Sequence, residues 1–122
     1  MERILIVDDE IEICNVLHEF FSLRGYEAHM AFDGPTAIRK VKEVRPHIVF
    51  LDIIMPGMGG IDVLKEIKKI DPTVGVVMLT AVIDHELAKR SLELGAYDYL
   101  TKPIDLEYLE TVAMVTIVNL LD

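Results

Sequence analysis

The chain has 122 residues, of which 52% are apolar and 27% charged, and its formal net charge is −9. That length suits one domain with one core, so we expect a single domain over residues 1–122. The acidic excess argues against direct binding to nucleic acid or an anionic membrane, and favours a divalent cation or a basic partner surface. One cysteine excludes an internal disulfide, and the apolar stretches fall short of the roughly 20 residues that span a bilayer. We therefore expect a cytoplasmic domain.

The apolar pattern alternates between short continuous runs and segments with helical spacing. Runs rich in Val, Ile and Leu are typical of strands buried on both faces, and apolar residues at i, i+3, i+4 and i+7 are typical of helices that cover a sheet. In chain order the pattern predicts strand 4–7, a helix that ends at Gly25, strand 26–31, helix 34–45, strand 48–51, helix 61–70, strand 74–79, helix 84–95, strand 96–100, and a helix from about Asp105 to the chain end.

Strand and helix thus alternate five times in strand-then-helix order. This order favours the α/β class, with a doubly wound parallel sheet that carries helices on both faces. The long irregular segment from Asp52 to Gly60 follows the end of a strand, where the loops of this class bind ligands.

Polar residues stand at the carboxyl ends of four predicted strands. Asp8 and Asp9 follow the first strand, Asp52 the third, Thr80 the fourth and Lys102 the fifth. If these strands are neighbours in the sheet, two or three carboxylates, a hydroxyl and an ammonium meet at one edge. The acidic pair could instead cap the helix that follows it.

Such a group of residues suits magnesium-dependent phosphoryl transfer. Clustered carboxylates repel each other, and a hard divalent cation such as Mg²⁺ relieves the repulsion through oxygen ligands. With an ammonium and a hydroxyl nearby, one carboxylate could attack phosphorus and form an aspartyl phosphate.

The segments ILIVDDE, IVFLDIIMPGMGG, VVMLTA and YDYLTKP resemble those of the response regulator receiver domain of two-component signal transduction. The resemblance covers the whole chain. It implies a flavodoxin-like fold, with a five-stranded parallel sheet in the order 2-1-3-4-5 and five helices. It also implies a phosphorylation-activated switch, which takes its phosphoryl group from a histidine kinase or a histidine phosphotransfer protein. Such a domain is a phospho-acceptor that assists its own phosphorylation and dephosphorylation, and not an enzyme with a separate substrate.

The resemblance also implies a role for each polar residue. Asp52 is expected to be the phosphorylated residue. Mg²⁺ is expected to bind Asp9 directly, Asp8 mainly through water, Asp52, and the backbone carbonyl of Ile54. Lys102 is expected to bind the phosphoryl group.

Thr80 and Tyr99 resemble the switch pair of the family. When the phosphoryl group draws the Thr80 hydroxyl inward, the Tyr99 ring would turn inward and change the surface formed by the last two helices and the last strand. Pro103 is expected to follow a cis peptide bond.

Three features depart from the usual family pattern. Gly59 stands where many relatives have a polar residue. Ile54 and Val82 occupy positions whose side chains line the approach of the hydrolytic water; neither can orient that water, so we expect slow self-dephosphorylation.

The last helix is apolar around much of its circumference and has no Lys or Arg, since none follows Lys102. We expect part of it to be exposed and to dock against a second copy or an output module.

Three other functions fit less well. A flavodoxin-like electron carrier needs a phosphate-binding loop after the first strand, where this chain has three acidic residues. An aspartate-dependent phosphohydrolase needs a second acid beside its nucleophile, and Asp52 is followed by apolar residues. A receiver-like module that only binds proteins would not need the acidic group.

Overall fold

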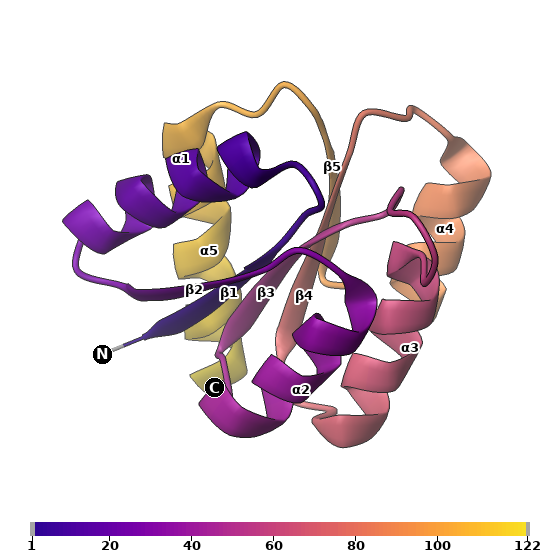
Figure 1. The fold of residues 1–122 in the computed structure, drawn as a ribbon, viewed down its shortest axis with the longest axis horizontal. Helices are drawn as coiled ribbons and strands as arrows, with labels where there is room; N and C mark the ends of the chain where they lie inside the picture. The colour runs from indigo at the N-terminus through magenta and orange to yellow at the C-terminus, as the bar shows by residue number, and fades with distance from the viewer. Residues whose placement is uncertain (1, 122) are drawn as a thin grey trace.

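The computed structural model describes residues 2–121, which form five strands and five helices in strict alternation (Figure 1). The expectation that the last helix reaches the chain end holds as far as Leu121, and Asp122 lies outside the described residues. None of the helices in the described range is long and apolar enough to cross a membrane. The elements are β1 (Arg3–Val7), α1 (Ile11–Leu23), β2 (Glu27–Ala31), α2 (Gly34–Val44), β3 (Ile48–Asp52), α3 (Gly60–Ile70), β4 (Gly75–Thr80), α4 (His85–Glu93), β5 (Asp98–Thr101) and α5 (Leu106–Leu121).

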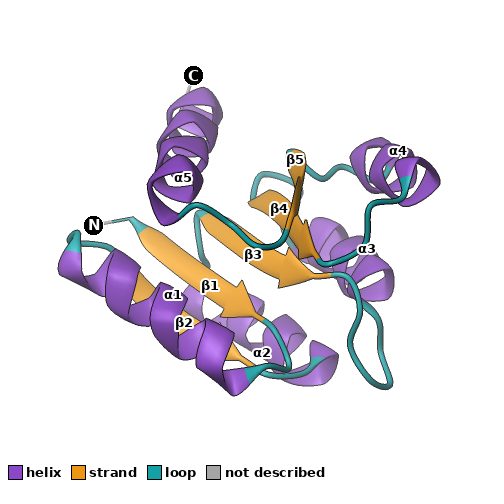
Figure 2. Cartoon of the chain, turned by 90° about the horizontal axis from the view of Figure 1, so that it is seen from above, coloured by secondary structure: helices purple, strands orange, loops and turns teal. Residues whose placement is uncertain are grey.

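The sheet is parallel and its strand order is β2-β1-β3-β4-β5, as expected. Helices α1 and α5 pack on one face, and α2 and α3 pack on the other (Figure 2). The register pairs Val7 with Leu51 and Asp52 with Leu79, so the carboxyl ends of the three central strands lie at one edge.

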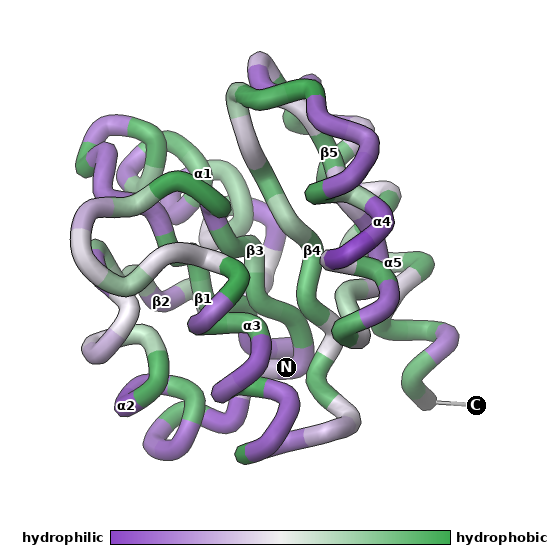
Figure 3. The backbone as a smooth tube through the Cα atoms, turned by 90° about the vertical axis from the view of Figure 1, so that its right-hand side faces the viewer, coloured by the Kyte–Doolittle hydropathy of each residue, from purple (hydrophilic) through white to green (hydrophobic). Residues whose placement is uncertain are grey.

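Every residue of β3 and β4 is buried, which explains their continuous apolar sequences (Figure 3). Successive side chains enter opposite cores: Phe50 lies in the core under α1 and α5, whereas Val49 and Leu51 lie in the core under α2 and α3. The Phe50 ring stacks on that of Phe21 in α1, with ring centroids 5.3 Å apart. This packing anchors β3 against α1.

Local signals account for several helix ends. Gly25 follows α1 with a φ of +89°, a conformation that favours glycine. The Asp33 side chain accepts a hydrogen bond from Thr36 N at the start of α2, and Asp84 accepts from Glu86 N at the start of α4.

The interpretation of Asp8 and Asp9 as a cap for α1 is wrong. The residue that precedes the helix is Glu10, and no side chain caps the helix there. Asp8 Oδ1 accepts a hydrogen bond from Glu10 N at 2.9 Å, but Glu10 precedes the first residue of the helix. The acidic pair therefore stays available at the sheet edge.

The last helix is partly exposed, as its composition predicts. Leu109, Ala113 and Ile117 are buried against the sheet, whereas Met114 and Val118 are 53% and 57% exposed. An apolar face of α5 therefore lies on the surface of the described chain.

Candidate functional site

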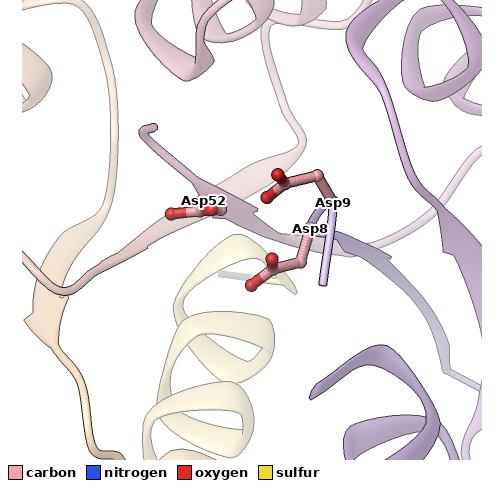
Figure 4. A group of neighbouring side chains, drawn as sticks. All are labelled: Asp8, Asp9 and Asp52. Carbon is pink, nitrogen blue, oxygen red and sulfur yellow. The ribbon is translucent and has the colours of Figure 1, made fainter. Parts of the chain in front are cut away.

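Three carboxylates meet beyond the ends of β1 and β3 (Figure 4). Asp8 and Asp9 directly follow β1, and Asp52 is the last residue of β3. One oxygen from each of the three lies within 4.8 Å of the others. Asp8 and Asp52 are buried and Asp9 is exposed, so the cluster opens to solvent on one side. The structure thus brings together the three carboxylates that the sequence places at strand ends.

Lys102 projects its ammonium into this cluster from the segment after β5. Its Nζ donates a hydrogen bond to Asp8 Oδ2 at 2.7 Å and lies 3.8 Å from Asp52 Oδ1. Its backbone N–H donates to the Thr80 carbonyl, 2.7 Å away, which ties the segment to the end of β4. The peptide bond between Lys102 and Pro103 is cis, as expected.

The electrostatics of the site follow from this crowding. Burial, and then the negative charge of Asp8, raise the pKa of Asp52 to about 6, although the charge of Lys102 opposes them. Burial acts to lower the pKa of Lys102, but the Asp8 hydrogen bond and the charge of Asp52 outweigh it, so this pKa is raised.

The site therefore combines three carboxylates with one ammonium. The site thus has an excess of negative charge, and the three aspartates offer only oxygen ligands. Both properties suit a hard divalent cation. The donor set fits Mg²⁺ better than a softer metal, which would favour nitrogen or sulfur ligands.

Thr80 and Tyr99 both bind the backbone of Val82. The buried Thr80 Oγ1 accepts a hydrogen bond from Val82 N at 3.1 Å, and the Tyr99 hydroxyl donates to Val82 O at 2.8 Å. The predicted switch pair is therefore connected through one residue of the β4–α4 loop. The sequence does not indicate this connection. The two contacts are made by the backbone N–H and carbonyl of Val82, and a backbone offers these groups whichever side chain it carries.

The two residues expected to line the approach of the hydrolytic water, Ile54 and Val82, are both apolar. Ile54 is 58% exposed, and its backbone N–H lies 3.4 Å from Asp52 Oδ1. Val82 is half-buried. Neither side chain carries a group that can form a hydrogen bond.

Two further features lie beside the site. The Cys14 thiol donates to the Asp8 carbonyl at 3.3 Å, and burial raises its pKa to about 12, so it remains a thiol at neutral pH. An apolar groove of about 610 Å³ runs between α1 and the segment after β5, with Ile13, Leu17 and Ile104 among its lining residues. Sequence reasoning found neither feature, since both depend on how α1 packs.

Comparison with known proteins agrees with this geometry. A family model described as the response regulator receiver domain matches residues 4–114. Sporulation initiation phosphotransferase F of Bacillus subtilis (strain 168) is 41% identical over 106 residues, which cover 87% of this chain and 86% of that protein. The regulatory protein AtoC of Escherichia coli (strain K12) is 40% identical over 112 residues, or 92% of this chain, but the match spans only 24% of AtoC.

A solved structure shows the same fold. The CheY-like response regulator receiver domain protein of Methanospirillum hungatei JF-1 superimposes with a TM-score of 0.95 at 27% sequence identity. The match covers 98% of this chain and 96% of that one.

Proposed function

We propose that this chain, which belongs to the response regulator receiver domain family of two-component signal transduction, is a switch phosphorylated on Asp52. The observation that carries the proposal is the position of the Asp52 carboxylate, which lies among two other carboxylates and 3.8 Å from the Lys102 ammonium. The unit that acts as the switch is the whole of residues 1–122.

The proposed reaction moves a phosphoryl group from a phosphohistidine to Asp52. One carboxylate oxygen forms the new P–O bond while the P–N bond to the donor imidazole breaks, and the imidazole keeps that electron pair and is protonated by solvent. The Lys102 ammonium stabilises the negative charge of the phosphoryl oxygens during transfer. The donor is a histidine kinase or a histidine phosphotransfer protein. The chain modifies its own side chain and turns over no separate substrate, so it is a phospho-acceptor that assists the reaction.

Magnesium fits the acidic cluster as the cofactor of this reaction. Asp9 would bind it directly, Asp8 mainly through water, and Asp52 and the Ile54 carbonyl would complete the protein ligands. A bound Mg²⁺ would neutralise charge on the phosphoryl oxygens. Asp9 is the exposed member of the cluster, so an ion can reach it from solvent.

The proposed response starts at Val82. A phosphoryl group on Asp52 would draw the Thr80 hydroxyl away from Val82 N, and the loop that also holds the Tyr99 hydroxyl would shift. The equilibrium between two arrangements of the Tyr99 ring would change, and with it the surface formed by α4, β5 and α5.

The test is transfer from a defined donor. A histidine kinase autophosphorylated with labelled ATP and then freed of nucleotide should pass its label to this chain in Mg²⁺ buffer. The same kinase should pass none to Asp52→Asn. Labelled ATP without kinase should leave the chain unlabelled. Label on the Asp52→Asn variant, or none on the wild type with any of several kinases, would contradict the proposal.

For the partner of α5 we propose a second copy of this chain. The exposed residues Met114, Val115 and Val118 form an apolar face without a basic residue, and two identical apolar faces complement each other around a two-fold axis. In sedimentation equilibrium the wild type should dimerise at high micromolar concentration. Val118→Lys should shift it toward monomer, and Val16→Lys on α1, where Val16 is 53% exposed, should not. A wild type that stays monomeric with and without phosphorylation would exclude the second copy and leave an output module as the partner.

A further inference from the structure

We propose that Gly60 is a positioning residue for Asp52, an inference that rests on the proposed function of Asp52. Gly60 is the first residue of α3, and its N–H donates to the Ile53 carbonyl at 2.8 Å. The start of α3 therefore lies directly against the end of β3, the strand that carries the phospho-acceptor (Figure 1).

A side chain at position 60 has no room. A Cβ built there would collide with the backbone carbonyl oxygen of Asp52 and would lie 2.6 Å from Ile53 Cα. These neighbours are backbone atoms, which cannot rotate aside as a long side chain can. Either α3 or the end of β3 would have to move, and Asp52 would move with the strand end.

The other members of the site are carried by other strands. Asp8 and Asp9 are held by β1, and Lys102 is held at the end of β4 through its hydrogen bond to the Thr80 carbonyl. A displacement confined to β3 therefore changes the distances from Asp52 to the groups that assist its phosphorylation. Misplacement of a reacting group by about 1 Å can cost about 100-fold in rate.

The neighbouring glycine provides a matched control. A Cβ at Gly59 would meet nothing closer than the Ile53 carbonyl oxygen at 3.7 Å, an ordinary contact, and the φ of Gly59 is −74°. Gly59→Ala and Gly60→Ala thus add the same methyl group to consecutive residues, but only the second crowds Asp52.

A second control separates positioning from stability. A Cβ at Gly75 would lie 2.5 Å from Thr116 Cγ2, so Gly75→Ala is also crowded. Gly75 begins β4 and pairs with Ile48 at the start of β3, which is the sheet edge opposite to Asp52. This variant should lose stability and leave the site geometry intact.

The experiment measures the initial rate of Asp52 phosphorylation by acetyl phosphate at saturating Mg²⁺, together with the Mg²⁺ dissociation constant and urea unfolding, for the wild type and the three variants. We expect Gly60→Ala to remain folded, to phosphorylate about 100-fold more slowly and to bind Mg²⁺ more weakly. Gly59→Ala should stay within about twofold of the wild type in rate, and Gly75→Ala should be less stable with an unchanged rate for its folded fraction.

Three outcomes would overturn the inference: a wild-type rate in Gly60→Ala, an equal loss of rate in Gly75→Ala, or a Gly60→Ala chain that is unfolded in buffer. In the last case Gly60 supports the whole fold rather than the position of one carboxylate. The two proposals fail in different ways. If the wild type takes up no phosphoryl group, the proposed function is wrong. If the wild type and Gly60→Ala are phosphorylated at the same rate, only the inference about Gly60 is wrong.

Discussion

The Lys102 ammonium lies 2.7 Å from Asp8 Oδ2 but 3.8 Å from Asp52 Oδ1, so its short ion pair is with the carboxylate that we propose is not phosphorylated. Without a phosphoryl group, Lys102 offsets the charge of Asp8 and leaves Asp52 less compensated. This arrangement agrees with the raised pKa of Asp52, which burial and the Asp8 charge both favour. It also makes the stability of the metal-free protein depend on one lysine.

Replacing Lys102 should therefore destabilise the metal-free fold. Lys102→Met leaves two buried carboxylates without a cation, and loss of one partner of a buried ion pair costs about 3 kcal/mol or more. Urea unfolding in the presence of a chelator measures the free energy of unfolding.

Lys69→Met is the control for this measurement. Lys69 pairs with Glu66 at 3.3 Å on the surface, where its side chain is 74% exposed, so its loss should cost less than about 1 kcal/mol. Equal losses in the two variants would show that the Lys102 pair is no stronger than a surface pair.

Asp9→Asn should stabilise the metal-free protein and weaken Mg²⁺ binding. Removing one of three clustered charges relieves repulsion, with a gain on the order of 1 kcal/mol, and also removes the most accessible ligand of the proposed ion. Unfolding with a chelator and Mg²⁺ calorimetry measure the two effects. Glu19→Gln, which removes an exposed charge from α1, should change neither; a metal-free Asp9→Asn less stable than wild type would argue against repulsion in the cluster.

The phosphorylated protein should lose its phosphoryl group slowly, because Ile54 and Val82 offer no hydrogen bond to an attacking water. Ile54→Asn should speed hydrolysis roughly fivefold to tenfold, the equivalent of one net hydrogen bond of about 1 kcal/mol. The decay of the acyl phosphate in Mg²⁺ buffer measures the rate. Ile83→Asn makes the same change at a 79% exposed position of the β4–α4 loop and should leave the rate unaltered. A wild-type lifetime of seconds would contradict the prediction.

His47 should make the fold sensitive to mild acid. Its Nδ1 accepts a hydrogen bond from Arg3 N at 2.9 Å, and burial, followed by the positive charge of Arg3, lowers its pKa below the ordinary value. When folding lowers the pKa of a histidine, the free energy of unfolding is unaffected by this residue above about pH 6.5, where the imidazole is neutral in both states. The free energy of unfolding then decreases as the pH falls from the ordinary pKa toward the lower pKa of the folded state, because the unfolded state binds the proton more readily.

The variant His47→Asn removes this titration. Between pH 8 and pH 5, the unfolding free energy of the wild type should therefore fall more than that of His47→Asn. His85→Asn, at an exposed position of α4, should follow the wild type. Parallel pH profiles for all three proteins would rule out a contribution from His47.

Much of the fold could be predicted because local signals and tertiary packing agree. The runs that became β3 and β4 are apolar at almost every position since both faces of those strands are covered. Gly25 and Asp84 mark helix ends through their own conformational and hydrogen-bonding preferences. The strand predicted at residues 96–100 starts later, at Asp98, because Ala96 N still donates to Ser91 O at the end of α4.

The carboxylate cluster was also predictable, because residues that follow parallel strands meet at one edge. The strand order itself came from family resemblance, since apolar runs do not specify their neighbours. Three relationships had no sequence signal: the preference of Lys102 for Asp8, the shared contact of the switch pair with Val82, and the crowding at Gly60. Each depends on distances of a few ångströms between segments far apart in the chain, or on backbone atoms that every residue has.

The central claim is that Asp52 accepts the phosphoryl group. Intact-mass measurement after incubation with acetyl phosphate and Mg²⁺ tests it most directly, with wild type and Asp52→Asn treated side by side. We predict an adduct of one phosphoryl group on the wild type and none on Asp52→Asn. An adduct on both proteins, or an unmodified wild type, would contradict the account.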